Sequence, residues 1–526
     1  MTEASTSFRR LAGRAVAFAA AAAALAGPRP AVAGGLEFPD LGTVAIGRGT
    51  AFVAKADTPL AFYYNPAGLS KQPRGSILLS ANLVHLSVGY QRTGSDRCLI
   101  EDDSGNCVGG FDPAMDYSMT RGVDEDGNPF FDPSATRPYD KVSFSGIGPA
   151  PVLVANWTGI GKAKGLSLSV GLLPPSSFGT PKYPHDGPQR YMLQEAHILA
   201  LFPGIGIAYN VNRYFQIGAV FLSGMTFVEV QQAARLSVNP NNMLTRNEDI
   251  GGDAAFKLHV KDLFIPTGIV GILSNPADFL ELGLSVKMPA MIKARGTVEL
   301  TPPVSEEQDA EITGDDTVEL RQHFPWVVRA GVRYIHRYFD VEADFVYENW
   351  SSLEAFEVDF VTCPSGKGGG LSAEEGEPCT QVMTAGGPVP LDDAKIPKNY
   401  RDTYSVRLGS DFALWPGHLT GRVGAFYQTS TFPKNYDTMN LDFPFGGEQV
   451  GVGGGLTWRV NQHFDLTAGY QHVFQRKVQV TQGIVQQATN LVTDPNGEDV
   501  SPGNTVNNGE YEVALNLFGL SFLGRF

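Results

Sequence analysis

Long apolar segments are scarce in this sequence. After residue 34, no uninterrupted apolar run reaches the ~18 residues that a membrane-spanning helix needs. Charged residues are also few, at 18% of the chain, and acids exceed bases to give a formal net charge of -15. This excess of acid argues against nucleic acid as a partner. The composition therefore favours neither a bundle of membrane helices nor a nucleic-acid-binding protein.

Cysteine and histidine are rare as well, with four and nine copies. The cysteines form two close pairs in polar segments, Cys98 with Cys107 and Cys363 with Cys379. In an exported protein such pairs predict disulfides within loops, and a zinc site is the alternative. No histidines converge on either pair, and no nucleophile motif accompanies the histidines expected on strands. We therefore expect no enzyme activity, no cofactor and no metal.

The N-terminal residues have the composition of an export signal. Arg9, Arg10 and Arg14 precede an apolar run over residues 15–25, and a small-x-small site follows at 31–33. This order of a basic, an apolar and a small-residue region predicts a signal peptide over residues 1–33. An exported chain without a membrane-spanning helix is either soluble or a closed β-barrel, because only helices and closed barrels satisfy every backbone group in lipid.

Glycine and aromatic residues are abundant, with 60 Gly, 32 Phe and 18 Tyr. Apolar and polar residues alternate over many segments of ~10 residues, a length that crosses a bilayer as a tilted strand. Short turns such as 461–463 alternate along the chain with long polar connections such as 93–140 and 350–400. This pattern predicts an all-β fold, a transmembrane antiparallel barrel of about 14 strands with long loops outside and both termini periplasmic. A soluble sandwich or propeller is the alternative.

The expected strands cover most of residues 75–526, which we take as the barrel. They lie near 75–92, 141–157, 165–173, 191–209, 214–234, 252–272, 277–300, 316–334, 339–349, 401–414, 419–430, 446–460, 464–480 and 508–526. Pro266 and Pro289 interrupt two long candidates.

The chain ends in a strand whose apolar residues share one parity. Phe518, Leu520, Phe522 and Phe526 fall on one face at period two. An exposed apolar edge would promote aggregation in a soluble protein, whereas a strand that faces lipid and pairs with the first strand would not. The ending resembles the terminal signature of bacterial outer-membrane barrels, which implies that Phe526 belongs to an assembly signal. A core strand that comes last by chance is the other interpretation.

Residues 34–74, ahead of the first expected strand, are apolar but have no strand period. They include Phe52, Phe62, Tyr63 and Tyr64 and close with Asn65, Pro66 and Ala67. A barrel of ~14 strands encloses more space than its own side chains fill. We therefore predict that this segment is a hatch that plugs the lumen, with those four aromatic residues as candidates to line a ligand path.

The segment 41–52, the pair Ala56-Asp57 and the run 64–69 resemble the FadL family of outer-membrane long-chain fatty acid transporters. The resemblance spans the mature chain and includes Tyr347 to Ser352, Pro397 to Tyr404 and Gly453 to Phe474, although only the hatch motif is specific and two loops are longer than usual. It implies a fourteen-stranded barrel closed by an N-terminal hatch, with Asn65, Pro66 and Ala67 seating that hatch against the wall. Ligand binding would then shift the hatch and open a path.

Four arginines are expected to face the lumen: Arg329, Arg333, Arg407 and Arg422. If the two turns concerned hold four residues each, Arg333 faces Asp340, Arg329 faces Asp344 and Arg422 faces Asp411. Such pairs stabilise a sheet by roughly 0.2–1 kcal/mol each. Arg407 would face Phe426 without an acidic partner, so it is the better candidate to anchor a carboxylate.

These features predict passive, hatch-gated diffusion of hydrophobic molecules across a Gram-negative outer membrane. The cargo could be fatty acids, or aromatic or alkane-like hydrocarbons, and the sequence leaves this open. We expect a monomer whose other partners are membrane lipid and the barrel assembly machinery. A general diffusion porin is the alternative, although an apolar plug argues against it, and a barrel enzyme such as a phospholipase is a further one.

Overall fold

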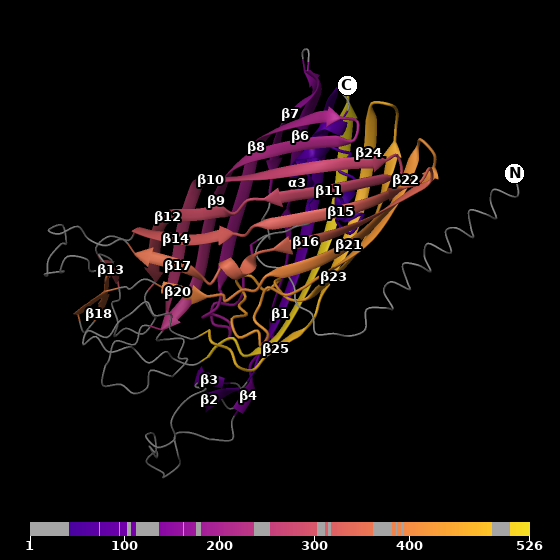
Figure 1. Ribbon diagram of the computed structural model, residues 1–526. Coiled ribbons are helices and arrows are strands. Elements are labelled where there is room, and N and C mark those ends of the chain that lie inside the picture. Colours follow the sequence, from indigo (N-terminus) through magenta and orange to yellow (C-terminus); the bar gives the residue numbers. More distant parts are fainter. Residues whose placement is uncertain are drawn as a thin grey trace, which may run out of the picture.

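The protein is described from a computed structural model, shown in Figure 1. The described residues are 41–72, 74–93, 95–101, 107–111, 136–160, 163–174, 180–235, 253–301, 311–313, 317–360, 381–384, 387–390, 394–485 and 505–526. The predicted signal peptide and residues 34–40 lie outside these ranges. None of the helices in the described part is long and apolar enough to cross a membrane.

One antiparallel sheet of strands closes on itself to form the barrel (Figure 1). Eight barrel strands are unbroken: β1 (Gly75–Arg92), β7 (Ala163–Leu173), β8 (Glu195–Asn212), β9 (Phe215–Arg235), β10 (Asp253–Ala277), β22 (Leu419–Gln428), β23 (Gln449–Arg459) and β26 (Gly509–Arg525). The barrel closes where β1 pairs with β26, from Ser76 opposite Arg525 to Arg92 opposite Gly509.

Six further barrel strands are each broken into two segments. These are β5 (Val142–Pro149) with β6 (Val152–Ile160), β11 (Leu280–Lys287) with β12 (Ala290–Thr301), β14 (Thr317–Phe324) with β15 (Val327–Ile335), β16 (Phe339–Glu348) with β17 (Ala355–Phe360), β20 (Ala394–Pro397) with β21 (Thr403–Trp415), and β24 (Phe464–Gln475) with β25 (Val478–Val480). Eight unbroken and six broken strands make fourteen, so the predicted fold and strand number are confirmed.

Proline explains three of the breaks. Pro151, Pro289 and Pro325 stand in the gaps that separate β5 from β6, β11 from β12 and β14 from β15. Proline has no N–H to donate to a neighbouring strand, so the ladder is interrupted at these positions. Pro266, by contrast, lies within β10, close to a register shift between Asp262 and Ile265.

The two ends of the barrel differ. Turns of two to four residues join β8 to β9, β10 to β11, β15 to β16, β21 to β22 and β23 to β24, and the C terminus lies at this end (Figure 1). Small strands lie beyond the opposite end: β2 (Ser95–Glu101), β3 (Cys107–Phe111) and β4 (Thr136–Pro138) form one sheet, and β13 (Glu311–Thr313), β18 (Gln381–Thr384) and β19 (Gly387–Pro390) another. This asymmetry is that of outer-membrane barrels, in which the short turns are periplasmic.

Side chains alternate between lumen and exterior along each strand. On β1, Leu78 and Leu86 are buried, whereas Leu79 and Leu83 are about half exposed. On β26, Phe518 and Leu520 are exposed in the same way and their neighbour Leu517 is buried. The exposed apolar face therefore points out of the barrel, where lipid covers it.

Candidate functional site

The hatch, as far as it is described, comprises residues 41–72 and lies inside the barrel. It contains three short helical segments, α2 (Thr43–Ile46), α3 (Ala61–Tyr64) and η1 (Pro66–Lys71). Nearly all of its side chains are buried, including those of Leu41, Phe52 and Leu69. α2 contacts β1, β23, β24 and β26, and η1 contacts β6 to β10 on another part of the wall. The hatch therefore crosses the lumen. Its exact limits at 34 and 74 remain a prediction.

Asn65 joins the hatch to the wall through its side-chain amide. Its Nδ2 donates to the carbonyl oxygens of Val53, within the hatch, and Ile272, on β10, at 2.9 and 3.0 Å. Its Oδ1 accepts from the backbone N–H of Ala67 at 3.3 Å and so caps η1, whose first residue is Pro66. Proline suits this first position because its N–H would have no helical partner. The motif is thus a helix start that also bonds to a barrel strand.

Glycines on the lumenal face let the hatch backbone approach the wall. A Cβ added to Gly271 would lie 2.1 Å from Asn65 Oδ1, and one added to Gly218 would lie 2.4 Å from the backbone carbon of Pro66. On the other side of the barrel, a Cβ on Gly424 would lie 1.9 Å from the carbonyl carbon of Arg48. Any side chain at these positions would displace the hatch, so the wall is shaped to receive it.

The four aromatic candidates pack within the hatch or against the wall. The rings of Phe52 and Tyr64 meet edge to face at 5.6 Å, and those of Tyr63 and Tyr64 at 5.1 Å. Phe62 lies against Gly171 on β7 and Gly206 on β8. All four are buried. They fix the internal packing of the hatch, and a role in lining a ligand path remains a proposal.

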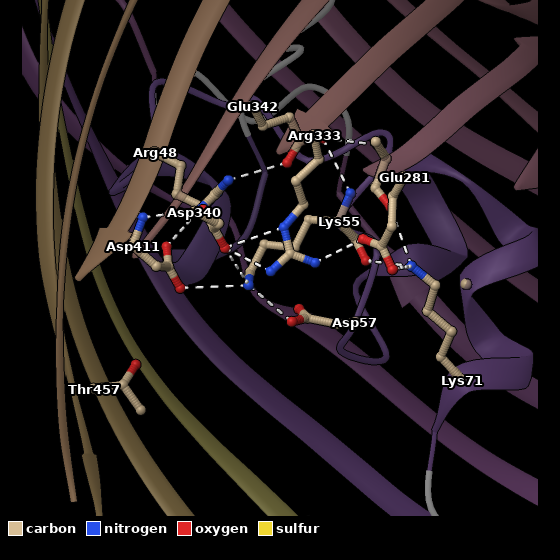
Figure 2. A network of polar contacts seen from close by, with 12 residues as sticks. Arg48, Lys55, Asp57, Lys71, Glu281, Arg333, Asp340, Glu342, Asp411 and Thr457 are labelled. Carbon is tan, nitrogen blue, oxygen red and sulfur yellow. Dashed lines mark hydrogen bonds and ion pairs between the residues drawn. The ribbon is translucent and has the colours of Figure 1, made fainter. Parts of the chain in front are cut away.

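A buried cluster of charges holds the centre of the hatch (Figure 2). Asp340, Glu342 and Asp344 alternate along β16, so all three carboxylates face the lumen. Arg48, which is fully buried, donates to Asp340 at 2.8 Å and to Glu342 at 3.0 Å. Its guanidinium also bonds to Asp411 on β21. One hatch side chain therefore bridges two neighbouring wall strands.

Lys55 and the hatch backbone complete this contact. Lys55 Nζ lies 3.2 Å from Asp340 and 2.8 Å from Asp57. Asp344 accepts the backbone N–H groups of Phe52 and Val53 at 2.8 and 3.0 Å. Glu342 accepts those of Ala54 and Lys55 at 2.7 and 3.1 Å. Four consecutive backbone donors of the hatch thus bond to two wall carboxylates.

The surrounding charges extend the network to further strands. Lys71 contacts Glu281 on β11 at 2.9 Å. Arg333 on β15 contacts Glu281 at 2.7 Å and Asp340 at 2.6 Å, and Figure 2 shows it between the two. Because a buried charge left without its partner is costly, roughly 3–5 kcal/mol, these pairs fix the position of the hatch.

Both central hatch cations remain charged. Burial lowers the pKa of Arg48, but Asp411, Asp340 and Glu342 raise it by more, so the pKa stands well above its ordinary value. Burial likewise lowers the pKa of Lys55, which Asp411, Asp57 and Asp340 raise above its ordinary value. The attraction between hatch and wall is therefore between full charges.

The expected pairing of β15 with β16 was wrong by two residues. Arg333 lies opposite Glu342 rather than Asp340, and Arg329 lies opposite Val346 rather than Asp344. The cause is the turn, which closes through a bond from His336 N to Phe339 O. A shift of two keeps the same side chains in the lumen, so Arg333 still reaches Asp340 diagonally.

Arg329 and Arg422 make different contacts from each other. Arg329 stacks over the ring of Tyr63 at 4.9 Å instead of pairing with Asp344. Arg422 lies opposite Asp411 as predicted and contacts it at 3.2 Å.

Arg407 faces Phe426 on one side as expected, at 5.0 Å from the ring. The expectation that it has no acidic residue opposite was wrong, because Asp344 lies opposite on the other neighbouring strand. Its guanidinium donates to Gln428 at 3.0 Å, to Ser405 at 3.1 Å and to the hatch residue Thr50. Arg407 therefore contacts the hatch directly.

The remaining predicted residues lie away from the hatch. Phe526 exchanges two backbone hydrogen bonds of 3.0 Å with Gly75 at the barrel seam, and its ring covers that glycine. Its role in assembly remains a prediction. Cys98 and Cys107 lie on the paired strands β2 and β3, but all four cysteine side chains lie outside the described part of the structure. The two disulfides therefore remain predictions.

Sequence reasoning missed Arg48, Lys55 and Glu342. One available signal was the alternation of Asp340, Glu342 and Asp344, since three acids on the lumenal face of one strand require cations opposite them. A second was the parity of Gly451, Gly453 and Gly455 on β23, which leaves the lumenal face of that strand without side chains. No group of histidine, cysteine and acidic residues suited to a metal occurs within the described ranges.

An apolar pocket lies nearer the long-loop end. Its lining comes from β1, β5, β8 and the segments around 181 and 441, and includes Leu86, Val88, Phe144, Tyr183, Ile198 and Phe445. Asp442 is the one charged residue among those that line it, and it bonds to the buried amine of Lys398. Its lining is therefore mainly apolar, but its volume of about 20 Å³ is close to that of a single water molecule.

Comparisons with known proteins agree with this architecture. The family profile described as outer membrane protein transport protein (OMPP1/FadL/TodX) matches residues 24–526. The crystal structure of a Pseudomonas aeruginosa FadL homologue is 16% identical, with a TM-score of 0.65 over 93% of this chain and 99% of that chain. The Pseudomonas putida toluene transporter TodX is 13% identical, with a TM-score of 0.57 over 94% and 100%.

The Ralstonia pickettii toluene transporter TbuX is 14% identical, with a TM-score of 0.56 over 92% of this chain and 98% of that chain. No curated protein matches the sequence. At these identities the solved structures establish the fold, and the family profile covers nearly the whole chain. The chain therefore belongs to the OMPP1/FadL/TodX family of the Gram-negative outer membrane, whose members transport hydrophobic compounds and are not enzymes.

Proposed function

We propose that the protein admits hydrophobic molecules by passive diffusion along a route that the hatch opens and closes. The observation that carries this proposal is the position of residues 41–72, which fill the lumen while bonding to the wall through charges and backbone N–H groups. Ion pairs and hydrogen bonds can be exchanged for water as a segment moves, with little net change in hydrogen bonding. A general diffusion porin would instead need an open polar lumen.

The hatch backbone also holds unfavourable conformations. Thr50 has a φ of 60° and Ala56 a φ of 34°, in the left-handed region that residues with a Cβ seldom adopt. Thr50 is β-branched, and its hydroxyl accepts a hydrogen bond from Arg407. Such conformations persist only where surrounding contacts impose them. Loss of the wall contacts would therefore allow this part of the hatch to relax into a second arrangement.

One observation bears on the cargo. The sequence-based anchor, Arg407, donates to the hatch residue Thr50 and to Gln428 on the wall strand β22. A carboxylate that took the place of Thr50 would also release this contact with the hatch. Mass spectrometry of lipids extracted from the purified protein distinguishes uncharged cargo from fatty acids.

A covalent lock tests the gating itself. Thr43 Oγ1 on α2 and Ser80 Oγ on β1 lie 2.8 Å apart, so cysteines at both positions can form a disulfide between hatch and wall. We expect the oxidised Thr43→Cys/Ser80→Cys protein to block uptake of labelled toluene and oleate into proteoliposomes, and dithiothreitol to restore it. The Ser80→Cys single variant, treated identically, is the control. If the oxidised double variant took up substrate as fast as the dithiothreitol-treated protein does, the hatch would not need to move.

We further propose that the barrel works as a monomer and that the assembly machinery recognises its last strand. The continuous pairing of β1 with β26 supports a barrel that is closed within one chain.

A further inference from the structure

Four cations gather on the outer face of three neighbouring strands. Lys261 on β10 lies directly opposite Arg295 on β12, and Lys293 on β12 lies directly opposite Arg321 on β14. Their sequence neighbours Val260, Ile292, Ala294 and Leu320 are buried on the inner face. The four charged side chains therefore point out of the barrel together, and we call them the outer basic cluster.

Two like-charged pairs face each other in this cluster. Like charges directly opposite on neighbouring strands destabilise a sheet, and the chain as a whole carries a net charge of -15. An overall acidic protein thus concentrates positive charge at one place on its outer wall, at a cost to its own stability. A bound anion would offset that cost.

The carboxylates near the cluster neutralise it only in part. Glu319 lies between Arg295 and Arg321, at 2.5 and 2.7 Å, and Asp359 contacts Arg321 at 2.8 Å. Asp262 accepts the backbone N–H groups of Lys293 and Phe264, at 2.8 and 3.0 Å. Within the part of the chain that the structure describes, neither Lys261 nor Lys293 forms an ion pair.

Three other exposed lysines are paired. Lys141 contacts Glu512 at 2.7 Å, Lys477 contacts the same carboxylate, and Lys182 contacts Glu195 at 3.0 Å. The two lysines of the outer basic cluster differ from these, so their amines remain available to a ligand.

The position of the cluster along the barrel axis, relative to the membrane, indicates which ligand it contacts. Toward the short-turn end, exposed apolar side chains follow the cluster on the same part of the wall: Leu263, Phe264, Met291 and Trp326, at 58%, 64%, 54% and 45% of their surface. The edge of the apolar band that faces lipid therefore lies next to the cluster. With the short turns periplasmic, the cations stand just beyond the outer edge of the hydrocarbon. This is the level of the lipid head groups of the outer leaflet.

We propose that the outer basic cluster binds the phosphate groups of an anionic lipid of the outer leaflet, with Lys261 and Lys293 as the principal ligands. Ammonium and guanidinium groups form their strongest hydrogen bonds with phosphate and carboxylate oxygens. Free phosphate has the same chemistry, but the adjoining exposed apolar side chains contact acyl chains, and this favours a phosphate carried by a lipid. The site lies on the outer wall, so it does not depend on the proposed gating.

Native mass spectrometry of the whole mature protein in neutral detergent tests this site, with diphosphorylated lipid A as the probe. Each basic residue near a charged lipid surface contributes about fivefold in affinity. We therefore expect Lys261→Gln/Lys293→Gln to weaken lipid A binding roughly 30-fold. Lys261→Arg/Lys293→Arg should keep the wild-type affinity. The matched control, Lys141→Gln/Lys477→Gln, removes two outward lysines that are already paired and should bind as the wild type does.

Two further arms distinguish lipid from free anion. Dephosphorylated lipid A should bind the wild type as weakly as diphosphorylated lipid A binds the double Gln variant, whereas millimolar inorganic phosphate should leave bound lipid A in place. Equal affinity of the double Gln variant and the control would overturn the proposal. Displacement of lipid A by inorganic phosphate would overturn the assignment to lipid. Heat-modifiable migration establishes that each variant is folded.

Discussion

Asn65 is the residue of the hatch motif that bonds to both the hatch and the wall. Its replacement by Ala would leave the carbonyl groups of Val53 and Ile272 without this donor. An unsatisfied buried polar group costs about 1–3 kcal/mol, which loosens the hatch but does not open a barrel held by its own ladder. We expect Asn65→Ala to fold normally, to conduct more ions than the wild type in planar bilayers, and to take up hydrophobic substrate more slowly.

Asn516→Ala is the matched control, because Asn516 bonds to Tyr470 and His472 on the outer face and not to the hatch. If Asn65→Ala had the conductance and uptake of the wild type, the motif would have no part in gating.

Gly424 allows the closest approach of hatch backbone to wall. A Cβ there would meet the Arg48 carbonyl carbon at 1.9 Å, and backbone cannot yield as a flexible side chain can. We expect Gly424→Val to prevent correct seating of the hatch and to make the Arg48 peptide bond accessible to trypsin. On the neighbouring strand, a Cβ on the outward-facing Gly454 would meet nothing closer than 3.7 Å. Gly454→Val should therefore resist trypsin like the wild type, and equal resistance of both variants would contradict this account.

At the scale of the element, period-two alternation located all fourteen barrel strands. It succeeded because a barrel wall imposes opposite environments on successive side chains. It could not establish the register of β15 against β16, because a shift of two residues leaves every side chain on the same face. Arg333 therefore reached the lumen as expected, but its partner across the strand pair did not follow from the sequence.

The final strand is the element whose assembly we expect to depend on its last residue. The backbone of Phe526 completes the pairing of β26 with β1 through two bonds to Gly75. We expect deletion of Phe526 to reduce the amount of folded, heat-modifiable protein in the outer membrane, while the protein that does assemble transports normally. Phe526→Trp keeps an aromatic end and should assemble well. Undiminished assembly after the deletion would show that this ending is incidental.

For the molecule as a whole, the sequence predicted that the hatch plugs the barrel, but it did not predict which wall residues the hatch contacts. Its apolar residues had to be buried, and the lumen was the available space. Its path has no regular period, however, and the wall partners of Arg48 are distant in the sequence, with Asp340 at a separation of 292 residues and Asp411 at 363. Only the closed barrel brings these charges together, so the pairing that holds the hatch could not be read from local patterns.

Removal of the hatch is the most direct test of the whole arrangement. Deletion of residues 34–74 should leave a folded barrel, because the strand ladder and its closure between β1 and β26 do not involve them. The lumen would then be open, lined by acids such as Asp340 and Asp411 and by the wall arginines Arg333 and Arg422 that pair with them. Because both signs of charge line it, we expect high, unselective conductance in planar bilayers, whereas the intact protein should be nearly closed. An intact protein that already conducts like the deletion variant would favour the porin interpretation instead.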